Sequence, residues 1–128
     1  MSLEWESNYI ENGSILATAV HGLATLESIK SMSVTLLNAA RQHNAHKFIT
    51  DCRDITQQIS TMEIHNLPQT LLDIGYSRSD YIALVYSETS GDAGNYRFFD
   101  NRCFSSNLHV RAFIDYESAY SWLFSASR

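Results

Sequence analysis

The sequence has little cysteine and no cysteine pairing pattern. Its two cysteines are Cys52, inside an apolar run typical of a strand, and Cys103, inside an aromatic run typical of a helix. No C-x-x-C spacing occurs, so neither a disulfide framework nor a cysteine-based metal site is expected. We interpret both residues as buried free thiols in a reducing cytosol.

Long apolar runs are also absent. No stretch approaches the ~18 consecutive apolar residues of a membrane span. The first residues, Met1 to Glu6, are acidic where a secretory signal peptide would be basic and then apolar. We therefore expect a cytoplasmic protein with no membrane span.

Positive charge is scarce and scattered. Nine Lys and Arg stand against 14 Asp and Glu, which gives a net charge of -5, and the basic residues are spread along the chain. Binding to a phosphate backbone requires a basic patch, so a nucleic-acid partner is not expected.

The sequence does contain enough apolar residues for one core. Hydrophobic residues make up 45% and aromatic residues 12% of 128 positions, which is too rich for disorder and sufficient for a single domain over residues 1–128.

Residue patterning predicts five strands. Alternation of apolar and polar residues around an Asn12-Gly13 turn predicts an initial hairpin, with Gly22 breaking its second strand. The run before Tyr86 is almost continuously apolar, which indicates a central strand buried on both faces. The expected strands are Leu3–Tyr9, Ser14–Val20, Lys47–Cys52, Asp80–Tyr86 and Val110–Ile114.

Apolar residues at helical spacing predict four helices between and after these strands. Thr25 caps the first, and a Ser60/Glu63 capping box starts the second, which Gly75 ends. Pro68 predicts a kink or a restart inside the second helix. The third follows Gly94 and carries Tyr96, Phe99, Cys103 and Phe104, and the fourth is capped by Asp115 and carries Ala119, Trp122 and Leu123.

The element order is therefore β-β-α-β-α-β-α-β-α. This order predicts an α/β fold with a mixed, mostly parallel five-stranded sheet and about four helices. We expect Tyr81–Tyr86 at its centre and Leu3–Tyr9 at an edge.

Three segments resemble the SpoIIAA-like group, which includes STAS domains and, at fold level, CRAL-TRIO domains. They are Ala19–Gly22 before the first helix, Phe48–Ile55, and Val110–Leu123. The chain is particularly similar to the small stand-alone bacterial proteins of that group without an assigned role. The resemblance implies a SpoIIAA-like fold and a regulatory or binding role.

In the anti-sigma-factor antagonists of this group, a serine at a helix start is switched by phosphorylation. The matching segment here is Ile59-Ser-Thr-Met62, with Ser60 at the helix start. The Asp before and the Gly after this serine, which belong to the group's motif, are missing. Ser60 is therefore a phosphorylation candidate by resemblance only.

Catalytic and metal-binding patterns are poorly represented. No Gly-x-Ser-x-Gly nucleophile turn occurs, and an enzyme would need an unrecognised site using His21, His65 or Ser60. His43 and His46 flank a turn, where two histidines without a nearby cysteine or acid are more typical of solvated helix ends than of a metal site. No metal or cofactor is expected.

A ligand site is expected beyond the carboxyl ends of the parallel strands. The loop Ser90–Gly94 offers free amides for an anion but lacks the Lys of a phosphate loop. A salt bridge and loop hydrogen bonds would explain Asp51 and Arg53 equally well. The candidate ligand-binding residues are Asp51, Arg53, Asp54, Ser60, Ser87 and Glu88.

The segment Tyr96–Phe104 has more aromatic residues than one buried face can hold. We therefore expect part of it to face a pocket or a partner, and the sequence favours a two-fold homodimer over the monomer in which this helix is simply buried. The candidate interface residues are Trp5, Tyr96, Phe98 and Phe99.

These features favour a non-enzymatic STAS-like module that binds a small apolar or anionic ligand, or a regulatory protein. The alternative is a small hydrolase or transferase. A deep cleft holding a strongly perturbed titratable residue would favour the enzyme, and an apolar tunnel or patch would favour the module.

Overall fold

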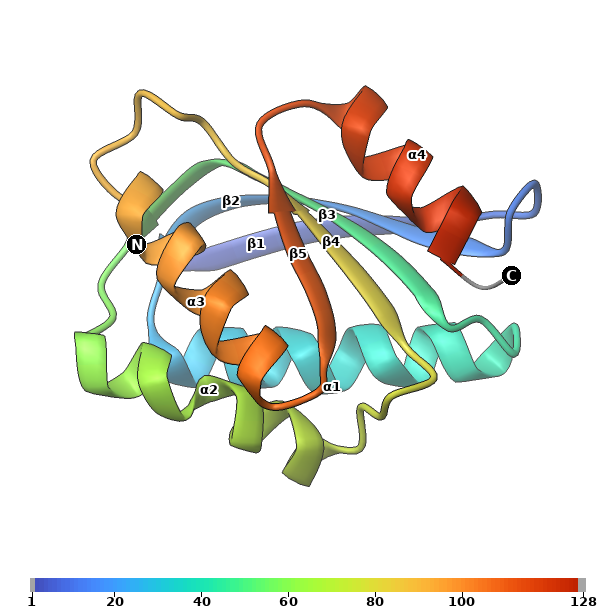
Figure 1. Cartoon of the computed structure of the whole chain (residues 1–128), viewed down its shortest axis with the longest axis horizontal. Coiled ribbons are helices and arrows are strands. Elements are labelled where there is room, and N and C mark those ends of the chain that lie inside the picture. Colours follow the sequence, from blue (N-terminus) through green and yellow to red (C-terminus); the bar gives the residue numbers. More distant parts are fainter. Residues whose placement is uncertain (1, 127–128) are drawn as a thin grey trace.

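A computed structural model describes residues 2–126, which form five strands and four helices in the predicted order (Figure 1). The elements are β1 (Leu3–Ile10), β2 (Ile15–Ala24), α1 (Leu26–Gln42), β3 (Lys47–Gln57), α2 (Thr61–Ile74), β4 (Tyr81–Val85), α3 (Ala93–Ser105), β5 (His109–Phe113) and α4 (Tyr116–Ala126).

The strands form one mixed sheet in the order β1-β2-β3-β4-β5. β1 runs antiparallel to β2 through the Asn12-Gly13 turn, where Gly13 has φ 95°, and the other three pairings are parallel. The predicted α/β architecture and the edge position of β1 are confirmed. The middle strand is β3 rather than Tyr81–Tyr86, because β5 lies on the far side of β4.

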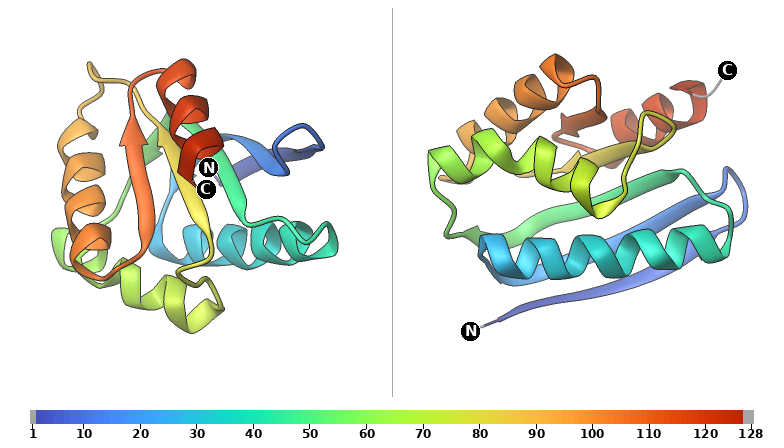
Figure 2. Two further views of the ribbon diagram at one scale, coloured as in Figure 1. Left: turned by 45° about the vertical axis from the view of Figure 1, so that its right-hand side comes forward. Right: turned by 90° about the horizontal axis from the view of Figure 1, so that it is seen from below.

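Helices cover the two faces of the sheet unequally (Figure 2). α1, α2 and α3 share one face and one core cluster, in which Leu36, Leu67 and Phe99 pack with Phe48 and Val110 from the sheet. α4 is on the opposite face, where its buried residues pack on Ile15, Ile49, Ala83 and Val85. The predicted burial of β4 on both faces is only partly correct, since Ile82 and Leu84 are half-buried.

The second helix runs through Pro68, so the restart that was one of the two alternatives expected there does not occur. α2 spans Pro68 without a break, and the proline ring is fully buried. The proline removes one N–H donor, but packing of the ring compensates for part of that loss. The expected helix starts are confirmed: Thr25 and Ser60 form capping boxes with Ser28 and Glu63, and Asp115 accepts from the Ser118 amide at 2.7 Å before α4.

Two strands are longer than the sequence predicted. β2 continues through Gly22 to Ala24, and β3 continues through the polar residues after Cys52 to Gln57. Gly22 does not end its strand, because it adopts φ 108° next to a register shift and lets the chain pass close to the Ser2 carbonyl. The two strands then pair with each other as far as Ala24 and Gln57.

A buried carboxylate ties together the opposite end of the sheet. Asp80, 2% exposed, precedes β4, and its two oxygens accept bonds from Arg41 at 2.9 and 2.8 Å. The Ser77 amide and the His46 ring bond the same carboxylate at 2.9 and 3.0 Å. The end of α1 is thereby fixed to the starts of β3 and β4.

Replacing Arg41 with methionine should lower the free energy of unfolding by about 3–5 kcal/mol, because Asp80 would be left buried without its bidentate partner. Arg53→Met is the matched control, since Arg53 pairs with Asp51 in an exposed ion pair. That variant should lose less than about 1 kcal/mol. Urea unfolding measures both values, and equal losses would show that Asp80 does not depend on Arg41.

Candidate functional site

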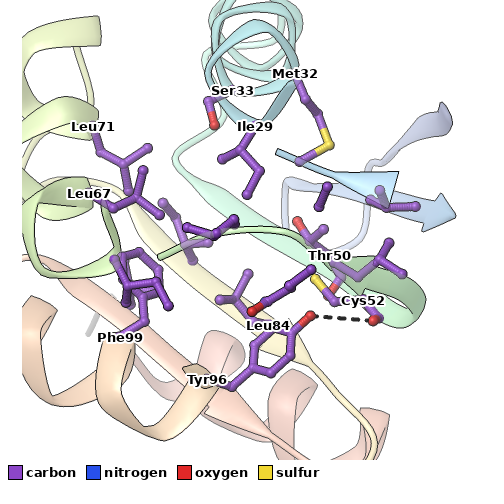
Figure 3. A pocket seen from close by; sticks show the side chains of 18 of the residues that line it. Ile29, Met32, Ser33, Thr50, Cys52, Leu67, Leu71, Leu84, Tyr96 and Phe99 are labelled. Carbon is purple, nitrogen blue, oxygen red and sulfur yellow. Dashed lines mark hydrogen bonds between the residues drawn. The ribbon is translucent and has the colours of Figure 1, made fainter. Parts of the chain in front are cut away.

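An apolar cavity of about 120 Å³ lies between the sheet and the helices α1–α3 (Figure 3). α1 supplies Ile29, Met32, Ser33 and Leu36, and α2 supplies Ile64, Leu67 and Leu71. α3 supplies Asn95, Tyr96 and Phe99. The sheet and its connections supply Leu3, Val20, Ala24, Phe48, Thr50, Cys52, Ile55, Gln57, Ile59, Tyr76, Ile82, Leu84 and Val110.

The spacing of these residues follows from the periods of helix and strand. The α1 residues recur at steps of three, one and three, which places them on one helical face. In β4, Ile82 and Leu84 face the cavity while Ala83 and Val85 pack under α4. The cavity therefore occupies the three-helix face of the sheet.

Three titratable side chains in the cavity wall are held in their neutral forms. Burial raises the pKa of the Cys52 thiol to about 12, and burial also raises the pKa values of Tyr76 and Tyr96. The Tyr76 hydroxyl donates to the Ser33 carbonyl at 2.7 Å, and the Tyr96 hydroxyl donates to the Cys52 carbonyl at 3.5 Å (Figure 3). The wall is thus an environment that disfavours charge.

Two neutral amide side chains of the cavity wall meet near the end of β3 and the start of α3. Gln57 and Asn95 are half-buried, and the Asn95 amide donates to the Gln57 side-chain oxygen at 2.9 Å. Asp92 accepts from the Gln57 backbone N–H at 3.0 Å. Ile59, which also lines the cavity, follows Gln57 in the chain, so the amide pair lies where β3 leads into α2.

The expected strand-end site is not assembled as predicted. Asp51 and Arg53 lie within β3, because that strand continues to Gln57, and they bond each other at 2.9 Å. Arg53 also lies 5.1 Å from the ring centre of Tyr116 in α4. Partial burial opposes ionisation of Asp51, but the bonds from Arg53 outweigh it and lower the pKa of its carboxyl. This pair belongs to the α4 face, opposite the cavity.

The other strand-end candidates have separate roles. Ser60 caps α2 by accepting from the Glu63 amide at 3.1 Å. The Ser87 hydroxyl bonds that of Thr89 at 3.0 Å, and Glu88 and Asp54 are exposed. The six candidates therefore do not converge on one ligand position.

The histidines are distributed over several elements. His21 on β2 and His65 on α2 are exposed. His43 stacks on Tyr9 at 4.0 Å, whereas His46 bonds Asp80, so these two neighbours have different partners. Within residues 2–126, no group of three or more metal-ligating side chains is present.

The candidate interface residues divide between core and surface. Tyr96 and Phe99 are 5% and 9% exposed, so they are core residues and are not available to a partner. Trp5 and Phe98 are half-buried, and Phe104, at 83%, is the exposed aromatic of this helix. A homodimer stays a prediction, and its interface would exclude Tyr96 and Phe99.

The sequence indicated that part of Tyr96–Phe104 faces a pocket or a partner, and Tyr96 and Phe99 do line the cavity. The rest of the cavity was missed because its residues look like ordinary core positions. Gln57 and Asn95 carried a signal in principle, since they are neutral polar residues next to apolar runs. They are 38 positions apart, however, and only the folded chain brings them together.

Comparison with known proteins identifies the fold. The sequence matches no family model and no curated protein. The structure is similar to the crystal structure of an uncharacterised protein of the DUF3478 family from Shewanella loihica PV-4, which has a SpoIIAA-like fold. The TM-score is 0.60 over 95% of this chain and 93% of that chain, at 15% sequence identity. The chain therefore has a SpoIIAA-like fold, as the sequence predicted.

Over residues 2–126, no helix combines the length and the apolar character that crossing a bilayer requires.

The two cysteines provide a matched test of the cavity. Cys52→Leu places its added carbons in the cavity and should leave the midpoint of thermal unfolding unchanged or higher. Cys103 is 0% exposed and lies outside the cavity. Cys103→Leu should lower the free energy of unfolding by about 1–3 kcal/mol, because the packed core must shift to accept the larger side chain. Calorimetry compares the two variants, and a similar loss in both would mean that the space beside Cys52 is not usable.

Proposed function

We propose that this protein binds a small apolar molecule in the cavity beneath α2 and does not transform it chemically. The observation that carries the proposal is the cavity itself, about 120 Å³ with a largely apolar wall. Ligand sites are typically concave and apolar, with a few polar groups that orient the ligand. Gln57 and Asn95 are groups of that kind.

The size of the cavity supports a binding role. Protein interiors are close-packed, and voids larger than a water molecule are few. Side chains that line a void of this size lack packing partners on one side. This destabilises the fold unless a ligand supplies the missing contacts. Ligand binding therefore explains a cavity that would otherwise only destabilise the fold.

The chemistry of the wall supports binding without catalysis. The thiol of Cys52 faces the cavity, but its pKa of about 12 keeps it protonated and unreactive. Ser60, His21 and His65, the residues of the alternative enzyme hypothesis, do not line the cavity. Ser60 is also occupied in its helix cap.

We further propose that the protein works in the cytoplasm. Cys52 and Cys103 are both buried free thiols. Unpaired cysteines of this kind are typical of proteins from reducing compartments.

Native mass spectrometry of protein purified from its host tests the proposed function. We expect a retained small molecule on the wild type and on Cys52→Ala, which keeps the cavity open. Cys52→Leu, which fills part of it, should retain much less. A ligand-free spectrum for the wild type, or equal retention by both variants, would overturn binding in this cavity.

A further inference from the structure

We infer that the cavity selects an uncharged ligand with one hydrogen-bonding group, which the amide pair Gln57 and Asn95 holds. This inference rests on the proposed function and specifies its ligand class. It also decides between the apolar and the anionic ligand that the sequence left open.

The wall offers no partner for a charge. None of the described residues that line the cavity is an acid, a lysine, an arginine or a histidine. A carboxylate or an ammonium group taken from water into such an environment loses its hydration without a compensating ion pair. The raised pKa values of Cys52, Tyr76 and Tyr96 have the same cause, because burial there also penalises the anionic forms.

The helix N-termini do not compensate for the cost of burying an anionic ligand. α1, α2 and α3 follow the parallel strands β2, β3 and β4, so all three begin at the same edge of the sheet, where helix dipoles favour negative charge. Two carboxylates of the protein already lie at this edge of the sheet. The Glu63 carboxylate accepts from the Ser60 amide at 2.9 Å, and Asp92 precedes α3 while bonding the Gln57 backbone.

Asp92 adds a second penalty for an anion beside the amide pair. Its carboxylate lies on the backbone N–H of Gln57, the residue whose side chain lines the cavity. A ligand carboxylate placed beside the Gln57–Asn95 pair would approach this negative charge. The ligand carboxylate and the Asp92 carboxylate would repel each other, and partial burial reduces the screening of this repulsion by water.

The amide pair can satisfy a neutral polar group. Their mutual bond uses one Asn95 N–H and the Gln57 oxygen. The Asn95 oxygen remains as an acceptor, and the Gln57 NH₂ group, which also approaches the Tyr96 hydroxyl, has a second N–H as a donor. A hydroxyl or a carboxamide matches this set, because each offers both hydrogen-bonding functions.

Cavity size limits the apolar part of the ligand. An engineered apolar cavity of about 150 Å³ in another protein accommodates benzene. The cavity here is about 120 Å³, which fits one six-membered ring or a short alkyl chain with its polar group beside Gln57 and Asn95.

Three probes that share one ring test the inference by calorimetric titration at pH 7: toluene, benzyl alcohol and benzoate. We expect toluene and benzyl alcohol to bind, and benzyl alcohol to bind at least about tenfold more tightly than benzoate. If toluene binds but benzoate binds as tightly as benzyl alcohol, the charge selection is wrong and the proposed function stands. If neither toluene nor benzyl alcohol binds, the proposed function itself fails.

Asn95→Leu tests the amide pair, because leucine has nearly the same size without hydrogen-bonding groups. The affinity for benzyl alcohol should fall about tenfold, the scale of one lost hydrogen bond, while that for toluene stays unchanged. Asn101→Leu, on an exposed position of the same helix, should change neither affinity. Equal weakening of both ligands by Asn95→Leu, or no weakening of either, would overturn the assigned role.

Discussion

The architecture depends on how three helices share one face of the sheet. α1 packs on β1 and β2, α3 packs on β5, and α2 contacts both of these helices. Apolar side chains of β3 and β4 on this face, such as Phe48 and Leu84, therefore meet α2 from below rather than a helix seated directly on the strands. The cavity is the space that this bridging arrangement leaves. On the opposite face α4 packs closely on Ala83 and Val85, whose small side chains allow a near approach.

Strand alternation explains why the polar candidates and the cavity are separated. Thr50 and Cys52 in β3 face the cavity, whereas the residues between and after them, Asp51 and Arg53, project to the α4 side. The expectation that a ligand site forms beyond the strand ends included Asp51 and Arg53. It fails here because β3 runs on to Gln57, so the true strand end comes six residues after Asp51. Gln57, at that end, is the polar residue that does reach the cavity.

Local signals in the sequence were sufficient for most of the fold. The capping box at Ser60, the stop at Gly75 and the Asn12-Gly13 turn depend on neighbouring residues, and periodicity identified every helix and strand. The errors have non-local causes. Gly22 stays within its strand because β3 pairs with β2 on both sides of it, and Pro68 stays within its helix because its ring is buried. The cavity was out of reach for the same reason, since it is defined by spaces between elements rather than by any one of them.

The cavity also links ligand binding to stability. At about 24 cal/mol per Å³, a void of about 120 Å³ weakens a fold by roughly 3 kcal/mol, a large share of the ~5–15 kcal/mol that keeps a domain folded. A ligand that fills the void and binds only the folded chain stabilises it further as its concentration exceeds the dissociation constant. The stabilisation acts on the bridge formed by α2, because Ile64, Leu67 and Leu71 would gain the contacts that the void denies them. A bound ligand would therefore stabilise the packing of α2, the helix that contacts both α1 and α3.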